Sequence, residues 1–287
     1  MRAIELNYYF QPCRRIERIQ RKLQFANVQY KTVDRTMVSI MEKPIKFTFP
    51  NGRDALAVHV QQTGELPAAL HALRLHRERP VLVLVGGAGK MEIEARNRLY
   101  SLFVEGLIPA VKALDATVVD GGTDAGVMRL MGQVRARVSG VFPLIGVAAV
   151  GTIASPDEPN PPRNAALLEP HHSHFVLVPG THWGDESPWL SAVADALSVG
   201  ACSVTVLING GDIAWKDVEQ SVKASRPVIV ISGSGRTADA LSRALRGEVV
   251  DERAKRLLTT ELLRVIDVTG DFDELRDLIC TMLSPEA

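Results

Sequence analysis

The chain has 287 residues, and its 33 lysines and arginines balance 33 aspartates and glutamates. This length suffices for one large α/β domain or two smaller ones, and a hydrophobic content of 46% is ordinary for a globular protein. Because the formal net charge is zero, no global field attracts nucleic acid or an anionic membrane, so any recognition of an anion must be local.

The cysteines and the apolar segments indicate where in the cell the protein is expected. Cys13, Cys202 and Cys280 show neither the paired spacing of a metal site nor a disulfide framework. No apolar run approaches the length of a membrane span, and the amino terminus has no clear signal-peptide core. We therefore expect a cytoplasmic protein that does not contact a membrane.

The first part of the chain differs from the rest. Within residues 1–43, five basic residues at 14–22 are set against Glu17, with Ile16, Ile19 and Leu23 at helical spacing, which predicts a helical extension with a solvated basic face. The five are Arg14, Arg15, Arg18, Arg21 and Lys22. A contact of this helix with nucleic acid or membrane is the alternative. Two segments of alternating hydrophobicity follow at 45–49 and 55–60, and the turn residues between them indicate a β-hairpin.

From Val81 to Leu283 short apolar segments alternate with helical patterns. This alternation is typical of a doubly wound, mostly parallel sheet with helices on both faces, and so predicts a Rossmann-like α/β domain over 44–287. Pro109 is expected to kink or divide one helix, residues 151–163 to form an exposed loop, and the apolar stripe of 272–283 to cover the sheet. The expected strands are 81–85, 116–119, 143–150, 175–178, 203–208, 228–231 and 265–268.

Four of these strands run into glycine turns. The carboxyl ends of parallel strands share one edge of a sheet, so the turns should converge on one crevice, although glycine turns can also serve only as connections. A glycine turn that opens a helix presents free N–H groups and a positive dipole end, which suit a phosphate. The candidate ligand-binding residues are Gly86, Gly87, Gly89, Lys90, Gly121, Gly122, Thr123, Gly126, Asn209, Gly210, Gly211, Asp212, Gly233, Ser234, Gly235 and Arg236.

The side chains of these turns suggest separate roles. Lys90 and Arg236 would supply charge to a diphosphate, and Thr123 and Ser234 would add hydroxyl donors. Asp212 would accept a hydrogen bond from a ribose hydroxyl because it follows Gly211 directly.

A group of histidines at His171, His172, His174 and His182 invites a metal interpretation. No carboxylate or cysteine recurs beside them at ligand spacing, so hydrogen bonds to backbone or ligand are expected instead. We expect neither a metal nor a cofactor.

Five motifs, in this order and at similar spacing, resemble the SLOG superfamily of Rossmann-like domains, and within it the prokaryotic relatives of the amino-terminal domain of melastatin-type TRP channels. They are Gly86-Gly87, Asp120-Gly-Gly-Thr-Asp-Ala-Gly-Val-Met128, His172-Ser-His-Phe-Val-Leu-Val178, Asn209-Gly-Gly211 and Gly233-Ser-Gly-Arg236. The resemblance covers most of the chain. It implies a sensor domain for a nucleotide-derived ligand, such as ADP-ribose or cyclic ADP-ribose, with an effector protein and a second copy of the chain as partners.

Two other branches of the superfamily imply different functions. Lonely Guy phosphoribohydrolases carry Pro-Gly-Gly-x-Gly-Thr-x-x-Glu, and this motif, laid on Asn209–Asp217, keeps the glycine pair but places the shorter Asp217 at the catalytic glutamate. Hydrolysis by Asp217, with Arg236 or Arg129 on the phosphate, is therefore the alternative function. DNA-uptake proteins also belong to the superfamily, but neutral net charge argues against nucleic acid as a partner.

Overall fold

A computed structural model describes residues 43–76, 78–87, 93–139, 141–154, 165–248 and 251–284. The expected helix within residues 1–43, Cys13, Gly89 and Lys90 lie outside the described residues, as does most of the expected loop at 151–163.

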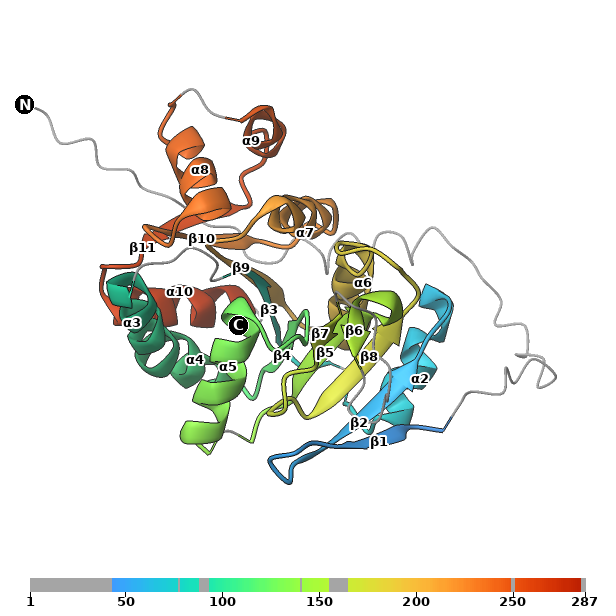
Figure 1. Ribbon diagram of the computed structural model, residues 1–287. Coiled ribbons are helices and arrows are strands. Elements are labelled where there is room, and N and C mark those ends of the chain that lie inside the picture. Colours follow the sequence, from blue (N-terminus) through green and yellow to red (C-terminus); the bar gives the residue numbers. More distant parts are fainter. Residues whose placement is uncertain are drawn as a thin grey trace, which may run out of the picture.

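Within the described residues, nine strands form one sheet in the order β1-β2-β8-β5-β4-β3-β9-β10-β11 (Figure 1). Every neighbouring pair is parallel except the hairpin of β1 and β2, in which Ile45 pairs with Ala57. This confirms the expected hairpin and the mostly parallel, doubly wound sheet. The strands are β1 (Ile45–Thr48), β2 (Asp54–His59), β3 (Val81–Gly86), β4 (Thr117–Asp120), β5 (Leu144–Ala149), β8 (His174–Val178), β9 (Ser203–Ile208), β10 (Val228–Ser232) and β11 (Leu263–Asp267).

Helices cover both faces of the sheet. One apolar core lies under α2 (Leu66–Ala72), α6 (Ser187–Leu197), α7 (Asp212–Lys223), α8 (Arg236–Leu245) and α9 (Glu252–Leu257). A second core lies under α3 (Ile93–Ser101), the π-helical η2 (Leu102–Leu107), α4 (Ile108–Ala113), α5 (Gly126–Arg137) and α10 (Phe272–Leu283). Figure 1 shows the α3, α4, α5 and α10 group on one side of the sheet and α6 with α2 on the other. The strands are near-continuous apolar runs because both of their faces are buried.

The smaller elements lie at the edges of this frame. They are η1 (Thr63–Glu65), η3 (Val150–Thr152) and the two-stranded pair of β6 (Ile153–Ala154) and β7 (Ala166–Leu167). Among the helices of the described ranges, none combines the length and the apolar character needed to cross a bilayer.

Two expectations about helices are confirmed. The helix that contains Pro109 is divided, because η2 separates α3 from α4 and Pro109 falls in the first turn of α4, where its missing N–H is tolerated. The terminal helix α10 buries Leu275, Ile279 and Leu283 against the sheet. Its apolar stripe is thus used within the domain.

Candidate functional site

The strand order places a topological switch point between β3 and β9. From β3 the chain moves outward through β4, β5 and β8, then returns to β9 on the other side of β3 and continues to β10 and β11. In open α/β sheets ligands bind outside the carboxyl ends of the strands at such a point. The turns that follow Gly86 and Ile208 therefore define the candidate site.

The turns after β3 and β9 touch each other. A Cβ atom at Gly86 would lie 1.8 Å from the carbonyl oxygen of Ile208, and the φ of Gly86 is +133°. The N–H of Gly87 donates to the same oxygen at 3.1 Å. Only glycine permits this approach of two backbones, so Gly86 is a packing requirement as well as a turn residue.

The turns after β9 and β10 are joined by hydrogen bonds that leave Asn209 and Ser234 buried. The N–H of Asn209 donates to Ser234 Oγ at 2.8 Å, and Asn209 Nδ2 donates to the carbonyl oxygen of Ser234 at 2.7 Å. Thr237 Oγ1 donates to the carbonyl oxygen of Gly211 at 3.0 Å. Because the Ser234 hydroxyl also donates to Ile231, at 2.5 Å, it serves to position these turns.

The backbone of these two turns adopts left-handed conformations. Asn209 has a φ of +54° and Arg236 a φ of +49°, values that residues with side chains rarely adopt, and Gly210, Gly233 and Gly235 are also left-handed. Such conformations persist only where the surrounding structure holds them, and they cluster at ligand sites. A positive φ also occurs at residues outside these turns, so the backbone conformation is consistent with a ligand site but does not by itself assign one. The residues are Arg74, Glu78, Asp115, Ser139 and Ser225.

Arg236 brings a positive charge to the start of α7. Its guanidinium lies over Gly211, since a Cβ atom at Gly211 would meet Arg236 Nη2 at 2.9 Å. Gly211 is the N-cap of α7, where unpaired N–H groups and the helix dipole favour an anion. Within the described part of the chain no ion pair engages this exposed guanidinium.

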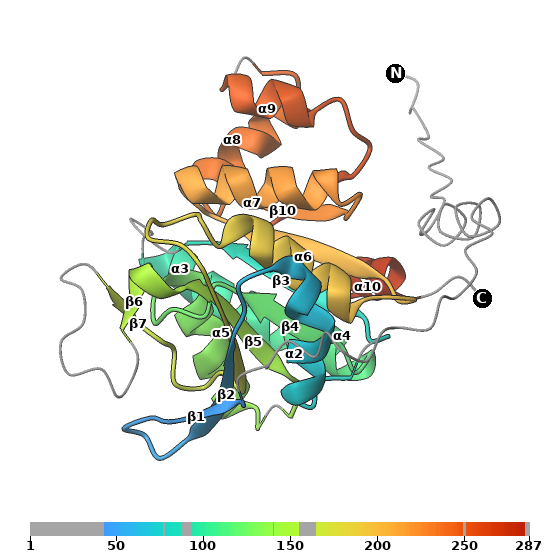
Figure 2. The same cartoon turned by 90° about the vertical axis from the view of Figure 1, so that its right-hand side faces the viewer.

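Asp212 faces a different group. Its exposed carboxylate accepts a hydrogen bond from Arg253 Nη1 at 2.8 Å, and Arg253 is also paired with Asp251 and lies over the ring of Trp215. Asp212 thus connects the start of α7 to α9. In Figure 2, α9 is at the top of the view, above α7.

The fourth glycine turn, after β4, is anchored elsewhere. Gly122 has a φ of +68°, and a Cβ atom there would lie 2.7 Å from the Cα of Gly146 in β5. Its carbonyl oxygen accepts the N–H of Glu169 at 2.9 Å, and buried Thr123 forms an isolated bridge with Leu168. Gly121 lies near Met128, and Gly126 begins α5 with a φ of +56°. This turn is therefore bound to the segment that precedes β8.

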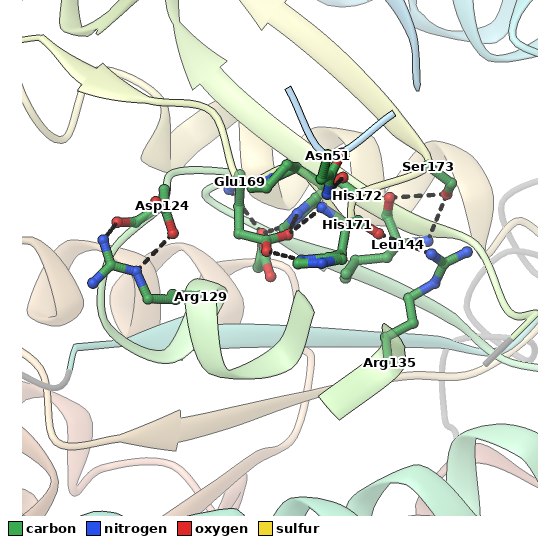
Figure 3. Close-up of polar contacts among 12 residues, drawn as sticks. Asn51, Asp124, Arg129, Arg135, Leu144, Glu169, His171, His172 and Ser173 are labelled. Carbon is green, nitrogen blue, oxygen red and sulfur yellow. Dashed lines mark hydrogen bonds and ion pairs between the residues drawn. The ribbon is translucent and has the colours of Figure 1, made fainter. Parts of the chain in front are cut away.

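A buried charge cluster lies beneath that turn (Figure 3). His172 Nε2 lies 2.9 Å from Asp120 Oδ1, and His172 Nδ1 lies 2.8 Å from Glu169 Oε2. His171 Nδ1 lies 2.6 Å from Glu169 Oε1, and the N–H of His171 donates to Glu169 Oε2 at 2.9 Å. Glu169 fits because α5 presents Gly132, where a Cβ atom would lie 2.0 Å from Glu169 Oε2.

The cluster shifts the pKa of His172 and that of Glu169. Burial disfavours the His172 imidazolium, but the charges and hydrogen bonds of Asp120 and Glu169 outweigh this and raise its pKa to about 9. Burial alone would raise the pKa of Glu169, yet its bonds to His172 and His171 hold that pKa below the usual value. His174, two residues on, is different: burial, with the nearby charge of Arg135, lowers its pKa to about 4.

The sequence predicted hydrogen bonds from His172 to backbone or ligand, whereas both of its ring nitrogens face carboxylates. Asp120 was part of a motif without a role of its own, and Glu169 was not singled out. One sequence feature could have revealed the cluster. Glu169 lies three residues before His172, and His172 lies just before the buried strand β8. Within the described residues no three His, Cys, Asp or Glu side chains are grouped as metal ligands.

Asp217 faces the start of α6. Burial raises the pKa of its carboxyl to about 7; Ser187 and the charge of Lys216 oppose this rise, and the charge of Glu186 adds to it. An open pocket of about 690 Å³ is lined by Ser187 on α6 and by Lys216 and Gln220 on α7. The raised pKa suits a group that exchanges protons near neutral pH.

The chain resembles known proteins over more than half of its length. A family model described as SLOG in TRPM, prokaryote, matches residues 79–276. The transient receptor potential cation channel subfamily M member-like 2 of Nematostella vectensis is 28% identical over 240 residues, which cover 71% of this chain. Subfamily M member 2 of Mus musculus is 26% identical over 199 residues, and member 7 of Homo sapiens is 26% identical over 196 residues. These matches cover 57% and 58% of this chain.

The relatives are much longer than the matched region. The alignments span 15% of the Nematostella vectensis protein, 13% of the Mus musculus protein and 10% of the Homo sapiens protein. The similarity therefore concerns one part of each channel.

Proposed function

Since this chain belongs to the family of prokaryotic SLOG domains related to TRPM channels, we propose that it binds a nucleotide-derived ligand at the switch point between β3 and β9. The proposed ligand class is NAD-derived and contains a diphosphate, as in ADP-ribose or cyclic ADP-ribose. The protein acts as a sensor in the cytoplasm. The spacing of its cysteines supports this compartment, because it is not that of a disulfide framework. An effector protein reads the bound state, and two copies of the chain form a homodimer.

One observation carries the proposal, namely the Arg236 guanidinium over Gly211 at the start of α7. A guanidinium can grip two phosphate oxygens at once while backbone N–H groups hold another. The turns that carry these groups are joined to each other and to the turn at Gly86, so the binding groups are held in place before the ligand arrives.

Binding is tested by isothermal titration calorimetry with ADP-ribose, cyclic ADP-ribose, NAD, AMP and ATP. We expect at least one diphosphate-containing compound to bind, and a corresponding rise in the melting temperature. The absence of heat and of stabilisation for all five compounds at millimolar concentration contradicts the proposal.

Asp217 supports a second candidate function, hydrolysis of a nucleotide N-glycosidic bond. A carboxyl with a pKa raised to about 7 can act as a general acid or base at neutral pH, and Asp217 occupies the position of the Lonely Guy glutamate. Release of free base from AMP, abolished by Asp217→Asn, establishes this function. Binding of the nucleotide without release of free base would support the sensor function instead.

A further inference from the structure

The buried cluster connects three parts of the molecule, namely the end of β4, helix α5 and the segment that leads into β8. Asp120 ends β4, Glu169 and His172 precede β8, and Glu169 lies against Gly132 of α5. The ring of His172 stacks on that of Phe175 in β8, with ring centroids 5.4 Å apart. None of these contacts belongs to the glycine turns at the switch point.

The geometry around His172 favours the charged imidazole. Each ring nitrogen faces a carboxylate oxygen, and an ionised carboxylate only accepts hydrogen bonds, so both nitrogens must donate. Two buried carboxylates without a counter-charge would each carry a large desolvation penalty. The positive charge of the imidazolium therefore offsets the cost of burying Asp120 and Glu169 close together.

The same two acidic residues hold the backbone of Gly122. Asp120 Oδ1 accepts the N–H of Gly122 at 2.7 Å, and the N–H of Glu169 donates to the carbonyl oxygen of Gly122 at 2.9 Å. Asp120 Oδ2 is buried and finds no hydrogen-bond donor among the described residues. Hydrogen bonds therefore do not satisfy both oxygens of the Asp120 carboxylate, and the nearby positive charge of His172 stabilises it.

We propose that His172 is a positioning residue for the ligand site: its imidazolium holds Asp120 and Glu169, and through them fixes the turn from β4 into α5. This inference rests on the proposed function, because β4 is the neighbour of β3 at the switch point and α5 begins at that turn. His172 need not touch the ligand.

The surrounding charges leave His172 as the group that titrates on the alkaline side. On α5, Arg129 is paired with Asp124, and Arg135 Nη1 donates to the carbonyl oxygen of His171 at 2.8 Å. His171 is bound to Glu169, and His174 is held neutral by burial and by Arg135. Raising the pH through about 9 removes the positive charge of His172 from the cluster.

The test follows the Gly122 amide and the His172 ring by NMR from pH 6 to pH 10, together with the affinity for ADP-ribose. In the wild type, protection of the Gly122 amide from exchange and ADP-ribose affinity should be constant up to about pH 8 and fall together as the His172 ring titrates. His172→Gln should loosen Gly122 at every pH and weaken ADP-ribose binding at pH 7 by about tenfold, or roughly 1.4 kcal/mol.

The matched control is His174→Gln, which changes a second histidine of the same segment outside the cluster. It should leave Gly122 exchange and ADP-ribose affinity unchanged. If His172→Gln does not fold, Glu169→Gln removes one of the two negative charges with little change in shape. It should lower the pKa of His172 and move the whole transition to lower pH.

The outcomes separate the two proposals. If Gly122 exchange in His172→Gln matches the wild type, or keeps the same alkaline transition, His172 does not position the turn. If His172→Gln loosens Gly122 yet binds ADP-ribose as the wild type does, the turn is outside the site, and only the positioning role fails. If neither ADP-ribose nor any of the other four compounds binds the wild type, the proposed function and the role of His172 at its site both fail. The Gly122 exchange then reports only whether the cluster holds the turn.

Discussion

Arg236 combines a charge with an unusual backbone position. The residue has a φ of +49° and lies directly after Gly235, so its side chain leaves the start of α8 toward Gly211. Neither charge nor glycine content alone would create an anion site here. The site depends on the pairing of this guanidinium with the N-terminus of α7.

Arg236→Ala should weaken ADP-ribose binding by about 2 kcal/mol, the cost of losing a charged hydrogen-bond partner. Arg236→Lys should recover only part of this loss, because an ammonium cannot grip two oxygens in a fixed plane. Lys90→Ala should have a smaller effect. Calorimetric titration measures all three, and the control Arg276→Ala, an exposed arginine on α10, should bind normally. Equal affinities for wild type and Arg236→Ala would contradict the placement of the phosphates.

Gly86 is predicted to be the most sensitive glycine of the site. In Gly86→Ala the new methyl group would collide with the Ile208 carbonyl oxygen at 1.8 Å, at a φ that alanine disfavours. The free energy of unfolding should fall by about 3 kcal/mol or more. Urea denaturation measures this, with Gly64→Ala as the control, because a methyl group there meets no atom within 4 Å. Equal losses for both variants would mean that the two strand ends separate freely.

At the scale of elements, the turns after β9 and β10 behave as one unit. Two hydrogen bonds join Asn209 to Ser234, and the N–H of Ala238 in α8 donates to the carbonyl oxygen of Asn209 at 2.9 Å. The starts of α7 and α8 are therefore fixed relative to each other. A ligand that contacts both helices meets a surface that is already ordered.

A double-mutant cycle tests this coupling. Asn209→Gly tolerates the left-handed backbone but removes the side-chain bonds, and Ser234→Ala leaves the buried N–H of residue 209 without an acceptor. Denaturation should show a non-additive term of about 1 kcal/mol between the two changes. The pair Thr48→Ala, on β1, and Ser234→Ala, in the distant turn after β10, should be additive. Additivity in the first cycle would show that the turns are independent.

At the scale of the whole molecule, stability should depend on pH through ionisable groups that are partly buried. The folded-state pKa of Asp217 is raised to about 7 from an ordinary value near 4, so the native state binds the proton more tightly than the unfolded state. Its contribution to stability is therefore lost progressively as the pH rises from about 4 to 7. His174 acts in the opposite sense, because its lowered pKa destabilises the fold as the pH falls below about 6.5.

Asp217→Asn should consequently be more stable than the wild type above pH 7, and this advantage should shrink toward pH 4. The asparagine mimics the neutral carboxyl, which burial favours. Thermal melts between pH 4 and pH 8 measure the difference. The control Asp277→Asn, on the exposed side of α10, should shift the melting temperature by the same small amount at every pH. A constant difference for Asp217→Asn would indicate that its carboxylate is ionised throughout the range.

Much of the fold could be predicted because it is encoded locally. Buried strands such as 203–208 are continuous apolar runs, helices such as 272–283 carry an apolar stripe, and both patterns are visible in a short window. The family could be recognised for the same reason, since its motifs are short segments in a fixed order. The four glycine turns were also visible, as each one follows a strand directly.

What the sequence by itself determined is therefore the class of the fold, the order of its elements and the positions of the turns. Only the tertiary structure decided which turns meet: those at Gly86, Gly210 and Gly233 adjoin, whereas Gly122 is bound to the segment at Glu169. It also decided that Asp120 and His172, 52 positions apart, share a hydrogen bond. The periodicity of apolar residues predicts whether a side chain is buried, but it does not predict which other side chain it contacts. That choice is made by the packing of strands and helices that are far apart along the chain.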